Sequence, residues 1–187
     1  MTVLVVFGGS LIAWTIGEAI ATPCDRPEAR TLALPTGLLL LAVHVVGILE
    51  HLRGASAPAP LVFGGIVLLE AGVALRLWSI ATLGRGFATA LGSARLVTTG
   101  PYRFVRHPSE LGLLLAAFGG AMMLASPLAA LGAVLLIPLA AVRSRREDVA
   151  LARTHGWAHA AWAAGVGWVG PKAPGIQRPG AYDQPTQ

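Results

Sequence analysis

Five apolar segments limit the folds that this chain can adopt. They lie at about residues 2–21, 33–50, 61–82, 111–125 and 127–142. A helix rises about 1.5 Å per residue and the hydrocarbon core of a bilayer is about 30 Å thick, so the first three segments are long enough to cross it. Backbone groups in lipid must be hydrogen-bonded within the chain, which favours helices throughout. The sequence therefore predicts an all-α membrane protein with about five transmembrane helices.

The last two apolar segments are short, and Ser126-Pro127 separates them. This dipeptide predicts a tight turn and therefore a short helical hairpin. Residues 147–165 contain good helix formers with Leu151 and Trp162 on one stripe, which predicts an amphipathic helix at the cytosolic membrane interface. The Pro/Gly-rich residues 171–187 are typical of a disordered tail. We expect one integral-membrane domain over residues 1–170, followed by that tail.

The composition excludes several classes of protein. The chain is 55% hydrophobic and only 12% charged, whereas about a quarter of the residues in a soluble domain are charged. Its arginines stand at the ends of apolar runs, which argues against an open basic face for nucleic acid. Cys24 is the only cysteine, so an intrachain disulfide and a cysteine-based metal cluster are excluded. The five histidines form no recognisable ligand set, and no metal site is predicted.

The arginines also predict an orientation in the membrane. They are concentrated after the first, third and fifth apolar segments, while Arg53 alone lies between the second and third. Because cytoplasmic loops are enriched in positive charge, we expect the N-terminus outside and the C-terminus in the cytosol. The first segment has no basic leader and keeps Glu18 near its end, which favours a retained span. Arginine in place of lysine, with much Ala, Gly and Leu, is typical of a GC-rich bacterial genome and favours a bacterial inner membrane.

A first polar cluster lies between the third and fourth apolar segments, within residues 84–108. Its glycines predict a loop, and Pro108 is suited to the first position of the next helix. The free N–H groups at that helix start, with Arg106 and His107 beside them, form a corner suited to an anion. The alternative is a positively charged loop without a ligand.

A second polar cluster, residues 143–148, follows the fifth apolar segment. Arg143 and Glu147 are four residues apart and could pair on one helix face. The alternative is a membrane-anchoring collar formed by the arginines. The predicted hairpin returns this cluster to the side of the first one, so both together favour a site for an anionic or zwitterionic small molecule. There an arginine could hold a carboxylate while an acid holds a cationic or hydroxylated group.

Several ionisable residues lie in or near the first three apolar segments, where charges usually pair or face a cavity. We expect structural pairing, with Arg76 reaching the interface or pairing with Glu70. His44 is expected to make a polar contact between helices. The five tryptophans are expected to anchor the protein at the membrane interface. The ionisable residues are Glu18, His44, Glu50, Glu70 and Arg76, and the tryptophans are Trp14, Trp78, Trp157, Trp162 and Trp168.

Two motifs resemble those of a known family. Leu83-Gly84-Arg85 and residues 96–108, which read LVTTGPYRFVRHP, closely resemble the signature of the isoprenylcysteine carboxyl methyltransferase family, which is related to phospholipid N-methyltransferases. The second family signature has an arginine, paired acids, a leucine, Phe-Gly and two tyrosines. Its counterparts here are Arg143, Glu147-Asp148, Leu151, His155-Gly156, His159 and Trp162. The resemblance covers a catalytic half at about residues 76–170.

The resemblance implies a multi-pass enzyme that binds S-adenosylmethionine at the cytosolic face. It implies methylation of a lipophilic or prenylated acceptor that enters from the lipid, most simply at a carboxylate oxygen. Arg143 and Asp148 would lie near the transferred methyl group, and Arg143 or Arg106 would orient an acceptor carboxylate. For an amine or thiol acceptor, Asp148 or His107 could take the proton. The implied cofactor-binding residues are Gly100, Pro101, Tyr102, Val105, His107, Pro108 and Glu147.

Four departures from the family pattern concern the acceptor side. Tyrosines are expected at the positions of Glu110, His159 and Trp162. Asp148 is one methylene shorter than the usual glutamate. Glu110 either favours a cationic or amine-bearing acceptor or pairs with an arginine. Two other functions remain open: a membrane reductase that uses NADPH, and a non-catalytic membrane module that retains the cofactor signature. No feature of the sequence specifies an oligomeric state.

Overall fold

The computed structural model describes residues 2–21, 27–84 and 96–168. These residues form a helical bundle, with one isolated bridge between Val105 and Gly167. The helices are α1 (Thr2–Ala21), α2 (Pro27–Leu52), α3 (Ala59–Leu83), the short 3₁₀ helix η2 (Gly100–Arg103), α4 (Pro108–Met123), α5 (Pro127–His155) and α6 (Trp157–Gly165). Both polar segments predicted to carry function lie in the described part, except residues 85–95 of the first.

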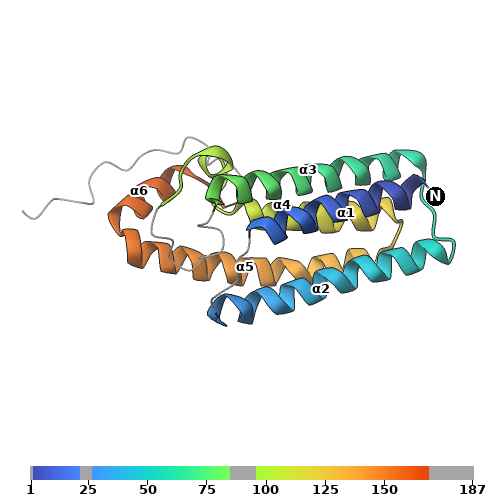
Figure 1. Cartoon of the computed structure of the whole chain (residues 1–187), viewed down its shortest axis with the longest axis horizontal. Helices are drawn as coiled ribbons and strands as arrows, with labels where there is room; N and C mark the ends of the chain where they lie inside the picture. The colour runs from blue at the N-terminus through green and yellow to red at the C-terminus, as the bar shows by residue number, and fades with distance from the viewer. Residues whose placement is uncertain (1, 22–26, 85–95, 169–187) are drawn as a thin grey trace, which may run out of the picture.

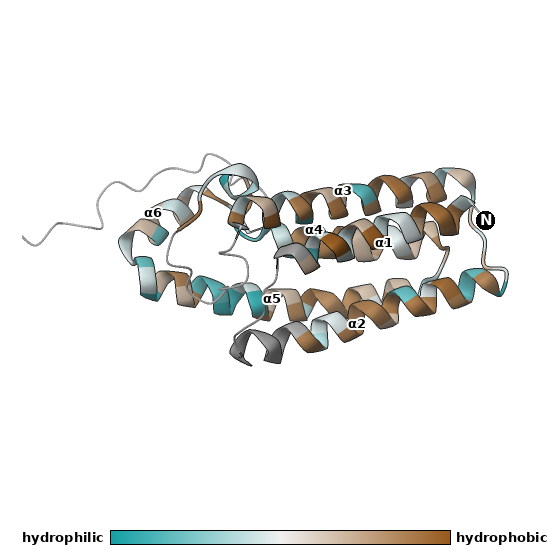
Figure 2. Cartoon of the chain, in the orientation of Figure 1, coloured by the Kyte–Doolittle hydropathy of each residue, from teal (hydrophilic) through white to brown (hydrophobic). Residues whose placement is uncertain are grey.

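The bundle is elongated and its two ends differ (Figure 1). One end holds the N-terminus, the α2–α3 connection and the α4–α5 turn. The other holds the end of α3, η2, the start of α4, the last turns of α5 and α6, and we call it the polar end. Figure 2 shows that the middle of the bundle is mainly hydrophobic, whereas the last turns of α5 are hydrophilic. The arginine-rich segments that are described therefore gather at one end, as the charge pattern predicts.

Four helices are long and apolar enough to cross a membrane: α1, α2, α3 and α5. The apolar helix α4 is shorter, with 16 residues. Large hydrophobic side chains such as Val5, Leu38 and Leu131 are exposed along the bundle, as expected where lipid covers the protein. The prediction of an all-α membrane protein with a short hairpin helix is confirmed.

One helix boundary was predicted wrongly. The helix formed by the last apolar segment does not end near residue 142, because α5 continues without a break to His155. The separate terminal helix is therefore shorter than expected and begins at Trp157 rather than at residue 147. Residues 143–155 contain arginine, alanine, leucine and glutamate, which are strong helix formers, and neither Gly nor Pro. Gly156, with φ +49°, ends the helix.

The predicted turn between α4 and α5 is confirmed, and Glu50 of α2 stabilises it. Ser126 is the N-cap of α5, where its hydroxyl accepts a hydrogen bond from the Ala129 amide at 3.0 Å. The same hydroxyl donates to Glu50, and the Leu128 amide lies 3.3 Å from Glu50 Oε2. Glu50 therefore joins α2 to the hairpin.

The closest helix contact joins α3 and α4 through glycines. A Cβ atom at Gly72 would lie 2.4 Å from the Ala116 nitrogen, and one at Gly119 would lie 2.3 Å from the Leu69 nitrogen. No side chain fits there, so the two backbones touch. Small residues allow this packing in membranes, where dispersion contacts replace the hydrophobic effect between helices. The contact fixes the start of α4 relative to the end of α3.

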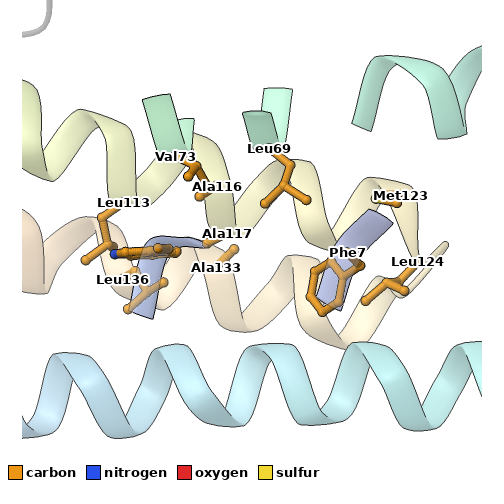
Figure 3. Close-up of a cluster of buried hydrophobic side chains, with 11 residues drawn as sticks. Phe7, Leu69, Val73, Leu113, Ala116, Ala117, Met123, Leu124, Ala133 and Leu136 are labelled. Atoms are coloured by element: carbon orange, nitrogen blue, oxygen red, sulfur yellow. The ribbon is translucent and has the colours of Figure 1, made fainter. Parts of the chain in front are cut away.

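The buried core lies where α1, α3, α4 and α5 meet (Figure 3). Phe7, Leu69, Leu113, Ala117 and Leu136 are nearly inaccessible to solvent. Alanines and glycines on α4 let the larger side chains of its neighbours approach, so this short helix is enclosed by the bundle.

Arg76 is the central buried charge of the bundle. Its guanidinium pairs with Glu18 of α1, and its Nη1 donates to the Ser109 carbonyl at 3.1 Å and to the Ser109 hydroxyl at 2.8 Å. The expectation of structural pairing is confirmed, but the predicted partner Glu70 is wrong. Residues six apart on a helix point about 240° from each other, and Glu70 instead accepts a hydrogen bond from Ser10 of α1.

Two further expectations concern aromatic neighbours of this region. Trp14 does not anchor the protein at the interface, because it is buried and its indole N–H donates to Glu18 at 2.9 Å. By contrast, Trp78 and Trp157 are exposed. The expectation of a polar contact between helices at His44 is wrong: its Nδ1 lies 2.7 Å from the Leu40 carbonyl oxygen of the same helix, and its contact with α1 is the packing of its ring against Phe7.

The glycine contact between α3 and α4 predicts a position-specific loss of stability. Gly119→Ala places a methyl group against the α3 backbone and should destabilise the protein by about 1–3 kcal/mol. Gly8→Ala is the matched control, because no atom lies within 4 Å of its added Cβ. Thermal unfolding of both variants in detergent measures the difference. Equal unfolding temperatures for Gly119→Ala and the original protein would contradict the proposed backbone contact.

Candidate active site at the polar end

The described part of the first polar cluster, residues 96–108, packs between the end of α3 and the residues that follow α6. Gly100 begins η2 with φ +58°, and a Cβ there would lie 2.7 Å from the Thr82 hydroxyl of α3. Pro101 and Tyr102 are buried in η2. Val105 then pairs with Gly167 in a parallel bridge. The loop is therefore fixed on both sides before it reaches His107.

His107 is held between two carboxylates of α5. Its Nε2 lies 3.0 Å from Asp148 Oδ1, and its Nδ1 lies 3.3 Å from Glu147 Oε2. The ring is buried. Burial by itself lowers the pKa of His107, but the hydrogen bonds and negative charges of Asp148 and Glu147 outweigh it and raise this pKa to about 9. Both ring nitrogens therefore act as donors at neutral pH, and the two polar clusters meet at this residue.

Arg106 holds α6 and the residues that follow it. Its Nε and Nη2 donate to the carbonyl oxygens of Val166 and Ala163, each at 2.7 Å. Its backbone N–H donates to the Gly167 carbonyl at 3.0 Å, and its Nη1 lies 3.7 Å from Asp148 Oδ2. These contacts position the C-terminal segment, and the role of Arg106 toward an acceptor stays a prediction.

Arg143 pairs with Glu110 of α4. Its Nη2 lies 3.1 Å from Glu110 Oε1. Of the two interpretations of Glu110, pairing with an arginine is therefore observed, and the ion pair of Arg143 reaches across helices rather than to Glu147. Glu110 also lines a small, mostly apolar cavity with His107. The remaining lining residues are Leu111, Leu114, Ala140 and Trp168.

The helix α6 covers the other side of the site. The Trp162 indole donates to the Tyr102 carbonyl at 3.2 Å, and the ring of His159 lies 5.6 Å from that of Trp162. His159 Nε2 also lies 3.7 Å from Asp148 Oδ1. Burial is the main cause that raises the pKa of Tyr102, so its hydroxyl stays neutral. Of the two residues of α6 that depart from the family pattern, His159 therefore lies beside the Asp148 carboxylate and Trp162 holds η2.

All ten predicted site residues are described, and they lie at the polar end. Asp148 contacts both His107 and Arg106, and Glu147 contacts His107. Arg143 instead pairs with Glu110, which lines a cavity together with His107. Sequence reasoning did not identify Trp168 as a site residue, although its ring lies 6.4 Å from that of His107. In the described part of the chain, no three His, Cys, Asp or Glu side chains are arranged to hold a metal ion. The other predicted members are Gly100, Pro101, Tyr102, Val105 and Pro108.

Comparison with known proteins finds a related family and two similar relatives. Residues 65–153 match the isoprenylcysteine carboxyl methyltransferase (ICMT) family. This part of the chain is similar to the ICMT family. Two similar relatives, from Oryza sativa subsp. indica and subsp. japonica, are each named probable protein-S-isoprenylcysteine O-methyltransferase. Each is 32% identical over 78 residues, which is 39% of this chain and 41% of the relative.

The ICMT match contains the elements that build the site and omits some that close it. It runs from α3 through α4 into the last turns of α5, so it includes His107, Arg143 and Asp148. The helices α1 and α2 lie outside it, as does α6. The chain matches only about two fifths of the length of these curated relatives, and its own activity is therefore taken up below as a proposal.

The contacts of His107 with Glu147 and Asp148 predict that the stability of the protein depends on pH. The pKa of His107 lies near 9, above its ordinary value of about 6.5, so its stabilising contribution is complete below about pH 6.5 and is lost as the pH rises through 9. The melting temperature of the original protein in detergent should therefore fall between pH 7 and pH 10. His107→Gln should be less stable at pH 7 and should show a smaller decline. An equal decline in both proteins would assign the pH dependence to other groups.

Proposed function

We propose that this protein is an integral-membrane methyltransferase that transfers the methyl group of S-adenosylmethionine to a lipophilic acceptor at the polar end. The observation that carries the proposal is the contact of His107, from the family signature, with Glu147 and Asp148 of α5. This contact joins the two halves of the signature in a protein built from membrane-length helices.

The residues around His107 fit the chemical groups of S-adenosylmethionine. His107 is the N-cap of α4 but makes no side-chain capping bond, so the first N–H groups of that helix are suited to the cofactor carboxylate. The Glu147 carboxylate is about a third exposed, at 35%, and with Asp148 it suits the ammonium group and the ribose hydroxyls. When bound, this cofactor supplies an electrophilic methyl group on a positively charged sulfur.

Arg143 is suited to orient the acceptor. It lies on α5 beside the cavity whose apolar walls come from α4 and α5, which suits a lipophilic molecule with a polar head group. A carboxylate is already ionised near neutral pH and needs no general base. Its oxygen forms the new C–O bond as the C–S bond of the sulfonium breaks, and the electron pair stays on sulfur. Positioning of the two reactants then supplies most of the rate, and Arg143 contributes to it by orienting the acceptor.

The names of the relatives support the same class of acceptor. Both are named as protein-S-isoprenylcysteine O-methyltransferases, so their acceptors carry a prenyl group and are methylated at oxygen. We propose O-methylation of a lipophilic carboxylate for this protein as well. The family match favours methyl transfer over the membrane reductase considered from the sequence, and loss of turnover with retained cofactor binding would identify the non-catalytic module.

The charge distribution supports a cytosolic site. Six described arginines lie in the segments at the polar end, whereas Arg53 lies at the α2–α3 connection at the opposite end. By the positive-inside rule, the polar end faces the cytosol and the N-terminus lies outside. The composition supports a bacterial inner membrane. The six are Arg103, Arg106, Arg143, Arg145, Arg146 and Arg153.

The first test is cofactor binding. Calorimetry should detect micromolar binding of S-adenosylmethionine and of its demethylated product to the purified protein in detergent. His107→Ala should abolish both, because it removes the residue that holds the two carboxylates in place. Arg145→Gln is the matched control, since Arg145 is exposed on α5, the helix that carries the two carboxylates. Binding of NADPH without binding of S-adenosylmethionine would support the reductase instead.

The second test separates catalysis from binding. Arg143→Gln should reduce methyl transfer to a prenylated carboxylate on the order of 100-fold, because a misplaced acceptor loses much of the benefit of positioning. Cofactor affinity should change little in this variant. Arg145→Gln, two residues away, should retain full activity. Unchanged turnover in Arg143→Gln would exclude the proposed role of this arginine.

A further inference from the structure

Glu110 has one carboxylate oxygen without a partner. Oε1 binds Arg143, but Oε2 is buried and accepts no hydrogen bond from any described residue. The residue is only 7% exposed. An unpaired buried polar atom costs about 1–3 kcal/mol, and more when it carries charge. Other acidic residues of the bundle are used differently: Glu18, Glu50 and Glu70 accept hydrogen bonds from neighbouring helices or turns.

Glu110 borders a small cavity in which part of a ligand could lie. The residue lines the cavity between α4 and α5, together with His107, Trp168 and three apolar side chains. Both ring nitrogens of His107 face Asp148 and Glu147, so that ring does not donate to Glu110. The apolar lining makes an added charge–charge hydrogen bond stronger than it would be in water. A ligand N–H or O–H group would satisfy Oε2.

The pair of Glu110 and Arg143 also limits the charge of the acceptor. A lone carboxylate bound to Arg143 would lie close to the Glu110 carboxylate, and like charges repel at short range. A positive group beside the acceptor carboxylate removes this repulsion and supplies the missing donor. A guanidinium and a carboxylate 3.1 Å apart are therefore complementary to a head group that carries a carboxylate and an ammonium side by side.

We propose that Glu110 is a specificity residue that binds the ammonium group of a lipophilic zwitterionic acceptor. The acceptor is then a free amino acid with a long apolar substituent, methylated at its carboxylate while the ammonium keeps its protons. This inference rests on the proposed methyltransferase function and narrows its substrate class. Glu110 acts on acceptor selection, whereas Arg143 acts on the reacting carboxylate.

The test compares three acceptors that share one prenyl chain. S-farnesylcysteine carries a free ammonium, N-acetyl-S-farnesylcysteine carries an uncharged amide, and 3-(farnesylthio)propionate carries no nitrogen. At pH 7 the kcat/KM of the original protein should be at least about tenfold higher for S-farnesylcysteine than for either of the others, as expected for a hydrogen bond between charged groups. This ranking needs no variant and so does not depend on the folding of one.

Glu110→Gln then tests the residue itself. The glutamine carbonyl can still accept from Arg143 while its NH₂ group replaces Oε2, which turns an acceptor into a donor. The preference for S-farnesylcysteine should fall to near one, with the rate for 3-(farnesylthio)propionate retained or raised. Arg145→Gln should keep the original preference.

The outcomes distinguish this inference from the proposed function. Equal kcat/KM for the three acceptors in the original protein overturns the inference alone. An equal loss for all three in Glu110→Gln also overturns it, because Glu110 would then serve only to hold Arg143. Methylation of none of the three by the original protein overturns the proposed function, and the inference with it.

Discussion

The backbone contact between α3 and α4 sets the geometry on which the polar end depends. With glycines on both helices, the two backbones meet without side chains between them. The end of α3 carries Arg76, which binds Ser109, and Thr82, which packs under Gly100. The start of α4 carries His107 and Pro108. The helix pair α3 and α4 therefore fixes both Gly100 and His107 of the signature loop, residues 96–108. A small change in the distance between these two helices would move that loop.

Buried charges supply the specificity that apolar surfaces lack in lipid. Lipid is as apolar as leucine, so hydrophobic faces alone do not determine which helices pair. Glu18 and Arg76 join α1 to α3, and Glu50 joins α2 to the α4–α5 turn. Arg76 also donates hydrogen bonds to Ser109 at the start of α4. Glu50 accepts a hydrogen bond from Ser126 at the turn that follows α4. The short helix α4 is thereby held at both ends by side chains from other helices.

Much of this structure could be predicted because its signals are local. The apolar lengths indicated the membrane helices, Ser126-Pro127 indicated the turn, and the hairpin indicated that residues 143–148 return to the signature loop. Errors arose where tertiary contacts decide the outcome. The partner of Arg76 depends on α1, and the burial of Trp14 depends on the same ion pair. The end of α5 was placed too early because hydrophobicity, rather than helix propensity, was taken as the boundary.

Within the site, the residue types were predictable but their partners were not. His107 and the acids of α5 were singled out from the sequence, whereas the backbone carbonyls that hold Arg106 carry no sequence signal. Trp168 was assigned to the interface because a lone tryptophan beside an apolar segment has many possible neighbours. Glu110 left two interpretations open, and only the position of α5 shows which arginine it meets.

The unbroken helix α5 places the proposed site residues at a particular depth. From Pro127 to Asp148 the axial rise is about 32 Å, close to the thickness of the hydrocarbon core. A helix that began at the far surface would therefore deliver Glu147 and Asp148 to the boundary between acyl chains and water. At that depth the proposed methyl donor, which is soluble in water, and the proposed acceptor, which dissolves in the membrane, could meet without either crossing into the other's solvent. The length of one helix thus sets how deep in the membrane the proposed site lies.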